Sequence, residues 1–313
     1  MSLRRLRLLN LRESRRVQHA FATLMPLDRG LEPRLRAVVE DVLDHPGSLA
    51  RAQLAYGIGI RRGLETQRAL KLGVAVEYFH SASLLFDDMP SMDDAAERRG
   101  RPCPHLVHGE AAAILGALAL ITRAYALLWE AIGEVPAARR TAAASLVSEC
   151  LGVAGILDGQ SRDVHFRREG ASVETAAGVA AGKTVPLVRL ALVLPALVAG
   201  EGPGNLRRLE RLAASWGLAY QILDDFKDSL MDAGETGKTA GRDAGLGRPN
   251  LPALAGTRRA LARLDHLLEE SRLVVGALTM EGEERWAPLG SLQDFLEEEA
   301  RDIAQRVGRR EAA

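Results

Sequence analysis

Apolar positions recur along most of the chain every three to four residues, which is the spacing of one face of an α-helix. Alanine, leucine and arginine dominate these segments, and all three are good helix formers. The alternation of β-branched and polar residues that is typical of half-buried strands is scarce. The pattern therefore predicts helices over Glu32–Asp44, Arg51–Ile60, Glu65–Asp88, Glu110–Ile132, Ala137–Asp158, Val173–Ala181, Thr184–Gly200, Leu206–Asp232, Pro252–Val275 and Leu292–Arg309.

Proline and glycine clusters separate these helices, for example at Pro46-Gly47 and from Gly200 to Gly204. No serine- or proline-rich linker divides the chain, and no repeat of solenoid length is present. We therefore expect a single all-α domain over residues 1–313. Residues 1–16, MSLRRLRLLNLRESRR, are interpreted as a basic, solvated N-terminal arm rather than as a membrane-surface helix.

Several helices are apolar on most of their surface, as over Ala111–Ile121 and Val185–Val198, and belong inside a bundle or at a subunit interface. Ala111–Ile121 ends at Thr122 and falls short of the roughly 20 residues of a membrane span, so no span is expected. Aromatic residues make up only 4% of the chain, so small and aliphatic side chains must line the interior. Such a lining permits either a long cavity or tight alanine packing.

The net charge and the number of cysteines each argue against a class of protein. Forty-one basic and 41 acidic residues give a net charge of 0, which argues against a general nucleic-acid binder. Two cysteines, Cys103 and Cys150, are too few for a disulfide framework or a cysteine metal cage. A reducing cytoplasm is the expected location.

Two acidic clusters each follow an apolar segment and are the strongest chemical signal. FDDMPSMDD contains Asp87, Asp88, Asp93 and Asp94, and ILDDFKD contains Asp224, Asp225 and Asp228. Carboxylates at the end of an apolar helix are costly unless they are exposed or bind cations. Asp224 and Asp228 are four residues apart and share one helical face, an arrangement that suits Mg²⁺. One such pair alone would be read as a helix cap, but two clusters favour a metal site.

Basic residues accompany both clusters. Arg98, Arg99 and Arg101 follow the first, and Lys183 and Lys238 each lie in a GKT sequence. Neither GKT has the spacing of a phosphate-binding loop, so a nucleotide hydrolase is excluded. Metal-binding carboxylates, cations and an apolar lining together describe a site for a diphosphate on a hydrocarbon tail.

With these motifs the sequence resembles the trans-prenyl diphosphate synthases. EYFHSASLLFDDMPSMDDAAERRGRP, GQSRDV, GKT, YQILDDFKD and GKTAGRDAG occur in the family's order and at similar spacing. The chain is most similar to the bacterial farnesyl and geranylgeranyl diphosphate synthases, especially those of carotenoid pathways. The resemblance implies a large helical bundle of the isoprenoid synthase type around a deep central cavity, and a homodimer.

The resemblance also implies a Mg²⁺-dependent condensation of an allylic diphosphate with isopentenyl diphosphate (IPP). It implies about three Mg²⁺ ions, with metal ligands Asp87, Asp88, Asp93, Asp224 and Asp228. The residues implied in catalysis are Asp87, Asp88, Asp93, Lys183, Asp224 and Asp225. Those implied in binding the allylic diphosphate are Arg98, Lys183, Thr184, Gln221 and Lys238, and those for IPP are Arg51, His80 and Arg99. Gln160 and Asp163 of GQSRDV are read equally well as ordinary helix residues or as partners of the arginines and metals.

The chain departs from the family in the acceptor motif G-K-R-x-R-P, which reads GSLARA here. Ser48 and Leu49 replace the lysine and the first arginine, whereas Arg51 is retained. Arg248 and Asn250 replace a lysine and a threonine after the second cluster. Losing a charge-assisted phosphate contact costs about 1.5–3 kcal/mol, so IPP binding is expected to be weakened.

Three interpretations therefore stay open. The first is a prenyltransferase with an altered IPP site. The second is an enzyme that ionises a prenyl diphosphate without IPP, such as a terpene synthase-like lyase or a transferase to another acceptor. The third is a non-catalytic subunit of a heteromeric synthase. The complete set of aspartates in the two clusters argues against this third interpretation.

Product length depends on the residues before the first aspartate pair. Ala82 and Ser83 are small where a bulky side chain would stop the growing tail, and Phe79 lies one helical turn deeper. A C20 product, geranylgeranyl diphosphate, is predicted first, and the C15 product, farnesyl diphosphate, second.

Overall fold

The computed structural model describes residues 6–167, 169–230 and 248–311 of the chain. Over these residues the fold is helical apart from a short hairpin, which confirms the all-α prediction. The elements are α1 (Leu11–Thr23), α2 (Pro33–Asp44), α3 (Ala50–Arg61), α4 (Thr66–Asp87), β1 (Glu97–Arg98), β2 (Arg101–Pro102), α5 (Pro104–His108), α6 (Glu110–Ile132), α7 (Ala137–Leu151), the π-helical turn η2 (Val153–Leu157), α8 (Asp158–Val164), α9 (Val173–Ala199), α10 (Pro203–Leu230), α13 (Leu251–Ala255), α14 (Thr257–Thr279) and α15 (Glu283–Glu311).

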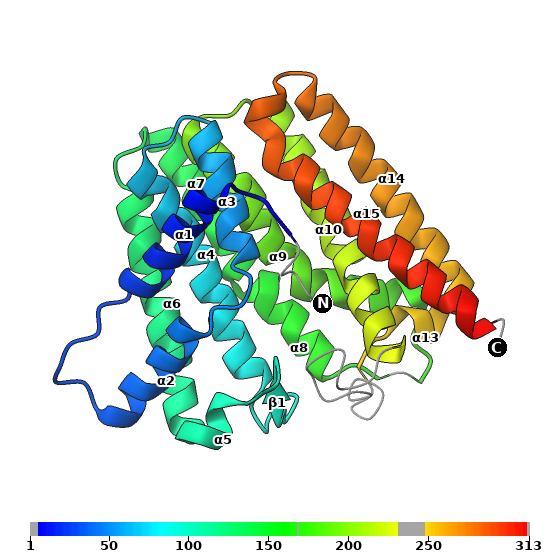
Figure 1. The fold of residues 1–313 in the computed structure, drawn as a ribbon, viewed down its shortest axis with the longest axis horizontal. Coiled ribbons are helices and arrows are strands. Elements are labelled where there is room, and N and C mark those ends of the chain that lie inside the picture. Colours follow the sequence, from blue (N-terminus) through cyan, green and yellow to red (C-terminus); the bar gives the residue numbers. More distant parts are fainter. Residues whose placement is uncertain (1–5, 168, 231–247, 312–313) are drawn as a thin grey trace.

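Helix α9 lies at the centre of the bundle, where it contacts α3, α4, α7 and α10 (Figure 1). Helix α4 packs between α3 and α6, and α14 and α15 cover α10 from the other side. The side chains of α9 from Leu190 to Ala196 are all buried, as expected for a segment that is apolar on every face. The core is therefore continuous through the described residues, and α4, α9 and α10 form its framework.

Helix α9 was expected as two helices that meet near Gly182, but it runs without a break. Gly182 instead allows α8 to pack closely against α9. A Cβ built on Gly159 of α8 would collide with the backbone of Gly182, so the two helices touch backbone to backbone at this point. This close approach sets α8 directly beside the GKT sequence of α9.

Two other helices are shorter than expected because glycines interrupt them. The helix expected over Ala137–Asp158 ends at Leu151, and Gly155 in the following turn has φ −101° and ψ −126°, outside the helical region. The helix expected from Pro252 is divided by Gly256, whose φ of +83° favours glycine. In both places the apolar periodicity continues across the break, so periodicity alone did not reveal it.

The expected N-terminal arm is wrong for residues 11–16, which belong to α1. The side chain of Asn10 accepts a hydrogen bond from the backbone of Glu13 at 2.9 Å, and Glu13 Oε2 accepts from the Asn10 backbone at 3.2 Å. This reciprocal capping box starts the helix. Val17 and Phe21 of α1 are buried, so the helix packs on the core. The N-x-x-E spacing was a readable signal for this start.

Three helical stretches of the described chain are long and apolar enough to cross a membrane, judged by length and composition: Glu110–Ile132, Ala137–Val164 and Val173–Ala199. The expectation of no span considered only the run Ala111–Ile121 within the first of them. In the bundle, 44% of the most apolar window of α6 and 56% of that of α9 are buried. Much of this hydrophobicity therefore serves the protein core.

Candidate functional site

The loop after α4 brings Asp93 back to the end of that helix. The backbone N–H of Asp93 donates to the carbonyl of Asp87 at 2.9 Å, and that of Ala95 donates to the carbonyl of Asp88 at 3.1 Å. The hairpin β1–β2, helix α8 and the C-terminal half of α10 lie at the same end of the bundle (Figure 1). Both acidic clusters are therefore at one end of the molecule.

Asp87 is the centre of a polar network that joins α4 to α8 and α9. Gln160 Nε2 donates to Asp87 Oδ1 at 2.7 Å. The Lys183 ammonium donates to Asp163 Oδ2 at 3.0 Å and lies 3.9 Å from Asp87 Oδ2. Gln160 and Asp163 are thus direct hydrogen-bond partners of Asp87 and Lys183, respectively.

Arg248 extends the network from the segment before α13. It is buried, and its Nη2 donates to Asp93 Oδ1 at 2.6 Å and to the carbonyl oxygen of Met92 at 3.0 Å. Its Nε lies 4.0 Å from Asp163 Oδ2. The arginine that replaces the family's lysine therefore keeps a positive charge beside the first acidic cluster.

The charges in this network are strongly coupled. Burial raises the pKa of Asp87, the neighbouring carboxylates of Asp93 and Asp163 raise it further, and the Lys183 ammonium opposes the shift. Burial lowers the pKa of Lys183, but the charges of Asp87, Asp163 and Asp93 outweigh burial, so that pKa is raised overall. The ionised form of Asp87 thus depends on the nearby Lys183.

Carboxylate oxygens are the ligands that Mg²⁺ prefers, so the donor chemistry of this cluster fits that metal. Within the described residues, however, no group of three or more histidine, cysteine, aspartate and glutamate side chains lies close enough together to hold a metal. Lys183 and Arg248 contact the carboxylates instead, and they neutralise part of the negative charge.

Asp88 points to a different partner from Asp87. It is buried, and Arg98 Nε donates to both of its carboxylate oxygens at 2.8 Å. Arg98 Nη2 also donates to Asp88 Oδ1 at 2.6 Å. This bidentate pair joins the end of α4 to the hairpin that carries Arg98 and Arg99.

Asp225 also has structural partners on both carboxylate oxygens. Gln221 Nε2 donates to Oδ1 at 2.9 Å, and the backbone N–H of Leu251 donates to Oδ2 at 2.8 Å. Gln221 in turn accepts from the hydroxyl of Thr184 at 3.1 Å. Asp225 therefore holds the start of α13 on α10, and Gln221 joins α10 to the GKT sequence of α9.

Asp224 and Asp228 of α10 are half-buried and share one helical face, as their spacing predicted, whereas Asp225 is buried. Lys238, expected to bind the allylic diphosphate, lies outside the described residues.

A second, basic centre lies farther back along α4, around His80. His80 is about two helical turns before the acidic end of α4. Burial lowers the pKa of His80 well below the usual value, and the charges of Arg51, Arg99 and Arg98 lower it further. The imidazole is therefore neutral at pH 7. Arg51 is in the first turn of α3. Helix α3, helix α4 and the β1–β2 hairpin therefore all contribute residues to this centre.

The turn of the hairpin directs Arg99 toward Gly47, in the loop before α3 where the acceptor motif begins. Arg99 and Gly100 both have positive φ, 56° and 74°, the combination of a type I′ turn. A Cβ on Gly47 would collide with the Arg99 guanidinium, so the missing side chain at Gly47 leaves space for it. In the same loop the side chain of Leu49 is buried, so nothing at that position replaces the family's arginine.

The residues expected to limit product length share one face of α4. Ala82 and Phe79 are buried, and the hydroxyl of Ser83 donates to the carbonyl of His80 at 2.9 Å. The ring of Phe79 meets Tyr125 of α6 edge to face, with 5.0 Å between the ring centroids. Sequence motifs did not identify Tyr125, because its contact with Phe79 arises only where α6 packs on α4.

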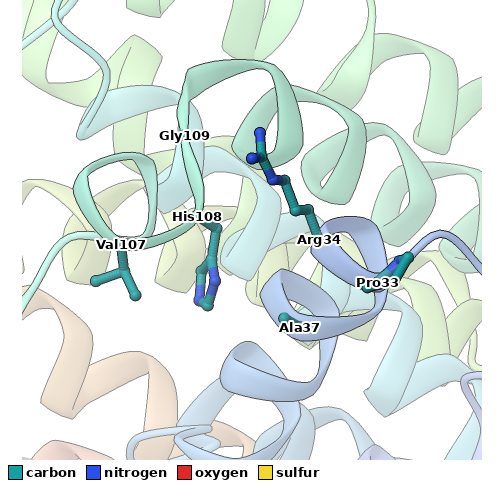
Figure 2. A pocket seen from close by; sticks show the side chains of 6 residues that line it. All are labelled: Pro33, Arg34, Ala37, Val107, His108 and Gly109. Atoms are coloured by element: carbon teal, nitrogen blue, oxygen red, sulfur yellow. The ribbon is translucent and has the colours of Figure 1, made fainter.

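A separate, open pocket of about 410 Å³ lies between α2 and the junction of α5 and α6 (Figure 2). Its lining is Pro33, Arg34, Ala37, Val107, His108 and Gly109. None of these residues was among the expected site residues. The deep central cavity remains a prediction from the family resemblance.

Comparison with known proteins places these observations in context. Residues 32–273 match the family model described as polyprenyl synthetase. The chain is 34% identical over 252 residues to the farnesyl diphosphate synthase of Escherichia coli (strain K12), covering 80% of this chain and 84% of that protein. It is 37% identical over 200 residues to the geranylgeranyl diphosphate synthase of Pantoea ananas, covering 64% of each chain. A geranyltransferase from Helicobacter pylori, complexed with magnesium and isoprenyl diphosphate, has the same fold, with a TM-score of 0.81, 24% identity and coverage of 92% and 96% of the two chains.

Proposed function

The chain belongs to the polyprenyl synthetase family and is a trans-prenyltransferase, and from this premise we propose that it extends an allylic diphosphate with IPP to a C20 diphosphate, with the C15 diphosphate as the second candidate. The observation that supports this reaction best is the pair of centres along α4. An acidic centre around Asp87 follows a basic centre around His80 by seven residues, about 10 Å along the helix axis. The allylic substrate and IPP each carry a diphosphate, so the reaction needs two separate binding centres.

Magnesium is the metal used in this family, and we propose about three ions per site. The proposed ligands are Asp87, Asp93, Asp224 and Asp228. Asp88 and Asp225 are left out of this set because both of their carboxylate oxygens already accept hydrogen bonds from other groups. When bound, the metal neutralises the charge that develops on the leaving diphosphate.

On the allylic side, Lys183 and Arg248 are positioned to stabilise the same charge. In the proposed reaction the C–O bond of the allylic diphosphate breaks, and both electrons leave with the diphosphate oxygen. Lys183 remains protonated throughout because its pKa is raised. Gln221 and Thr184 are proposed to orient the diphosphate from α10 and α9, together with Lys238. A fixed cation at the leaving group favours ionisation because it needs no reorganisation.

On the acceptor side, Arg51, His80 and Arg99 are proposed to hold the diphosphate of IPP. The IPP double bond attacks the allylic cation, a new C–C bond forms, and the proton lost from IPP passes to the departing diphosphate. Neutral His80 donates a hydrogen bond but adds no charge, so Arg51 and Arg99 carry the electrostatic attraction. No protein base is required.

A product assay tests this function. The protein is incubated with Mg²⁺, radiolabelled IPP and, in turn, dimethylallyl, geranyl and farnesyl diphosphates. A labelled C20 diphosphate is the expected result. Diphosphate release without incorporation of label would instead favour an enzyme that ionises its substrate without IPP, and no turnover of any primer would favour a non-catalytic subunit.

Ala82→Tyr is expected to shorten the main product to C15. Ala82 is buried on the same face of α4 as Phe79, so a phenol at position 82 fills the space one turn nearer to the acidic end. The measurement is chromatography of the dephosphorylated products. An unchanged chain length would show that the tail does not pass Ala82.

We also propose a homodimer formed through α6. Five large apolar side chains of that helix are 37–61% exposed: Ile114, Leu115, Leu118, Tyr125 and Trp129. A stripe of this kind along one helix is unusual on a monomer and indicates an interface. The buried thiols of Cys103 and Cys150 are compatible with a cytoplasmic location, which we propose as well.

Leu118→Arg is expected to convert the dimer to a monomer, because it buries a charge at the centre of the proposed interface. Sedimentation velocity measures the change. Leu273→Arg is the matched control, since Leu273 is 71% exposed on α14. A dimer that survives in the α6 variant would exclude this interface.

A further inference from the structure

Glu77 is a buried carboxylate that the proposed reaction does not use. It lies on α4 one turn before His80, and only 3% of its surface is exposed. Its Oε2 accepts a hydrogen bond from the backbone N–H of Ala52 in α3 at 2.9 Å. A buried carboxylate is costly unless its partners compensate for lost hydration, so its surroundings need an explanation.

The contact with Ala52 supplies a cap that α3 lacks. The N-cap residue of α3 is Leu49, which has a left-handed backbone (φ 51°) and makes no side-chain cap hydrogen bond. Helix starts leave backbone N–H groups without partners within the helix. Glu77 satisfies one of them from the neighbouring helix, and it does so beside Arg51, the retained arginine of the acceptor motif.

The two helices are held close at this point by a glycine. A Cβ on Gly73 would lie 2.6 Å from the carbonyl oxygen of Ala52. Gly73 is one turn before Glu77 on α4, so this close approach brings the Glu77 carboxylate to the first turn of α3. The geometry is therefore built into the backbones of both helices.

The charges around Glu77 belong to the acceptor side of the site. Burial raises the pKa of Glu77, whereas the charges of Arg51 and Arg99 and the hydrogen bond from Ala52 lower it. Burial lowers the pKa of Arg99, as do the charges of Arg98 and Arg51, and Glu77 opposes this shift. Arg51 and Arg99 thus repel one another, and Glu77 is the buried acidic residue whose carboxyl group interacts with both of them.

We propose that Glu77 is a positioning residue for the acceptor diphosphate: it fixes the first turn of α3 and balances Arg51 and Arg99 so that both guanidinium groups stay in the acceptor centre. This inference rests on the proposed function, because it assigns IPP to that centre. The role of Glu77 matters more in this chain than in one with the complete acceptor motif, because Ser48 and Leu49 leave Arg51 as the motif's remaining cation.

Glu77→Gln tests the proposal, because glutamine keeps the shape and an oxygen for the Ala52 N–H but removes the charge. The KM for IPP is expected to rise about tenfold, as for the loss of one charge-assisted interaction. The KM for the allylic diphosphate and kcat at saturating IPP should stay within about twofold. Glu65→Gln is the matched control, since Glu65 caps α4 itself through the N–H groups of Gln67 and Arg68. It should change neither KM.

A binding measurement separates this proposal from the proposed function. Calorimetry with inorganic pyrophosphate, in buffer with a chelator and no divalent metal, reports on the basic centre without turnover. Glu77→Gln is expected to weaken this binding about tenfold. Wild-type protein that incorporates no IPP would overturn the proposed function. An unchanged or lower KM for IPP, an equal rise in both KM values, or unchanged pyrophosphate binding would each overturn the role of Glu77.

Discussion

Replacing Asp87 with asparagine is expected to lower kcat about a thousandfold and to leave the free energy of unfolding within about 1 kcal/mol of wild type. The loss of activity follows from removing a charged ligand at the point where leaving-group charge develops. Stability is spared because asparagine still accepts from Gln160, and Lys183 keeps its hydrogen bond to Asp163 at 3.0 Å. Steady-state kinetics and urea unfolding measure the two effects.

The stability of this variant should also differ in its pH dependence. Because the pKa of Asp87 is raised in the folded protein, its contribution to stability is present at low pH and is lost as the pH rises through that value. Asparagine does not titrate, so the variant should gain stability relative to wild type as the pH rises.

Asp158→Asn on α8 is the control for Asp87→Asn. Its carboxylate is exposed and pairs with Arg162 at 2.7 Å, away from the acidic centre. Wild-type activity is expected for this variant. Retention of more than about a tenth of kcat in Asp87→Asn would mean that Asp87 is not a metal ligand.

Lys183→Ala is expected to lower the free energy of unfolding by about 3 kcal/mol and to abolish measurable turnover. Lys183 is the cation shared by Asp87 and Asp163, and both carboxylates are buried. Without it, two buried carboxylates face each other and Asp87 loses its ion-pair partner, while Arg248 remains 4.0 Å from Asp163. Protonation of Asp87, whose pKa is raised, relieves the repulsion, so the loss of stability should be smaller at pH 5 than at pH 8. Urea unfolding at both pH values is the measurement.

Lys71→Ala provides the comparison for Lys183→Ala. Lys71 also pairs with a carboxylate, that of Glu130 at 2.8 Å, but both side chains are partly exposed. Surface pairs of this kind contribute about 0–1 kcal/mol. Equal destabilisation by the two alanine variants, or a loss that does not depend on pH, would show that Lys183 does not compensate the buried aspartates.

The local features of the protein could be predicted from its sequence. Apolar spacing identified α2, α3, α4 and α6 to within one or two residues, because a helix that packs on a core must repeat its apolar positions every turn. The spacing of Asp224 and Asp228 placed both on one face for the same reason. The start of α1 was equally local, in Asn10 and Glu13, but the excess of arginine there suggested a solvated arm instead.

Partners far apart in the sequence were decided by the tertiary structure. The backbone contact between Gly159 and Gly182 brings Gln160 and Asp163 to Lys183, and Arg248 reaches Asp93 from 155 residues away. Tyr125 meets Phe79 only because α6 packs on α4. A periodic pattern records which face of a helix is buried, but not which other helix covers that face.

The different surroundings of Asp87 and Asp88 show this division most clearly. The order of residues alone places two carboxylates directly after the apolar part of α4. Successive residues on a helix point about 100° apart, so one carboxylate faces Lys183 and the other faces Arg98. Only the packing of α8, α9 and the hairpin around the end of α4 decided which cation each carboxylate meets.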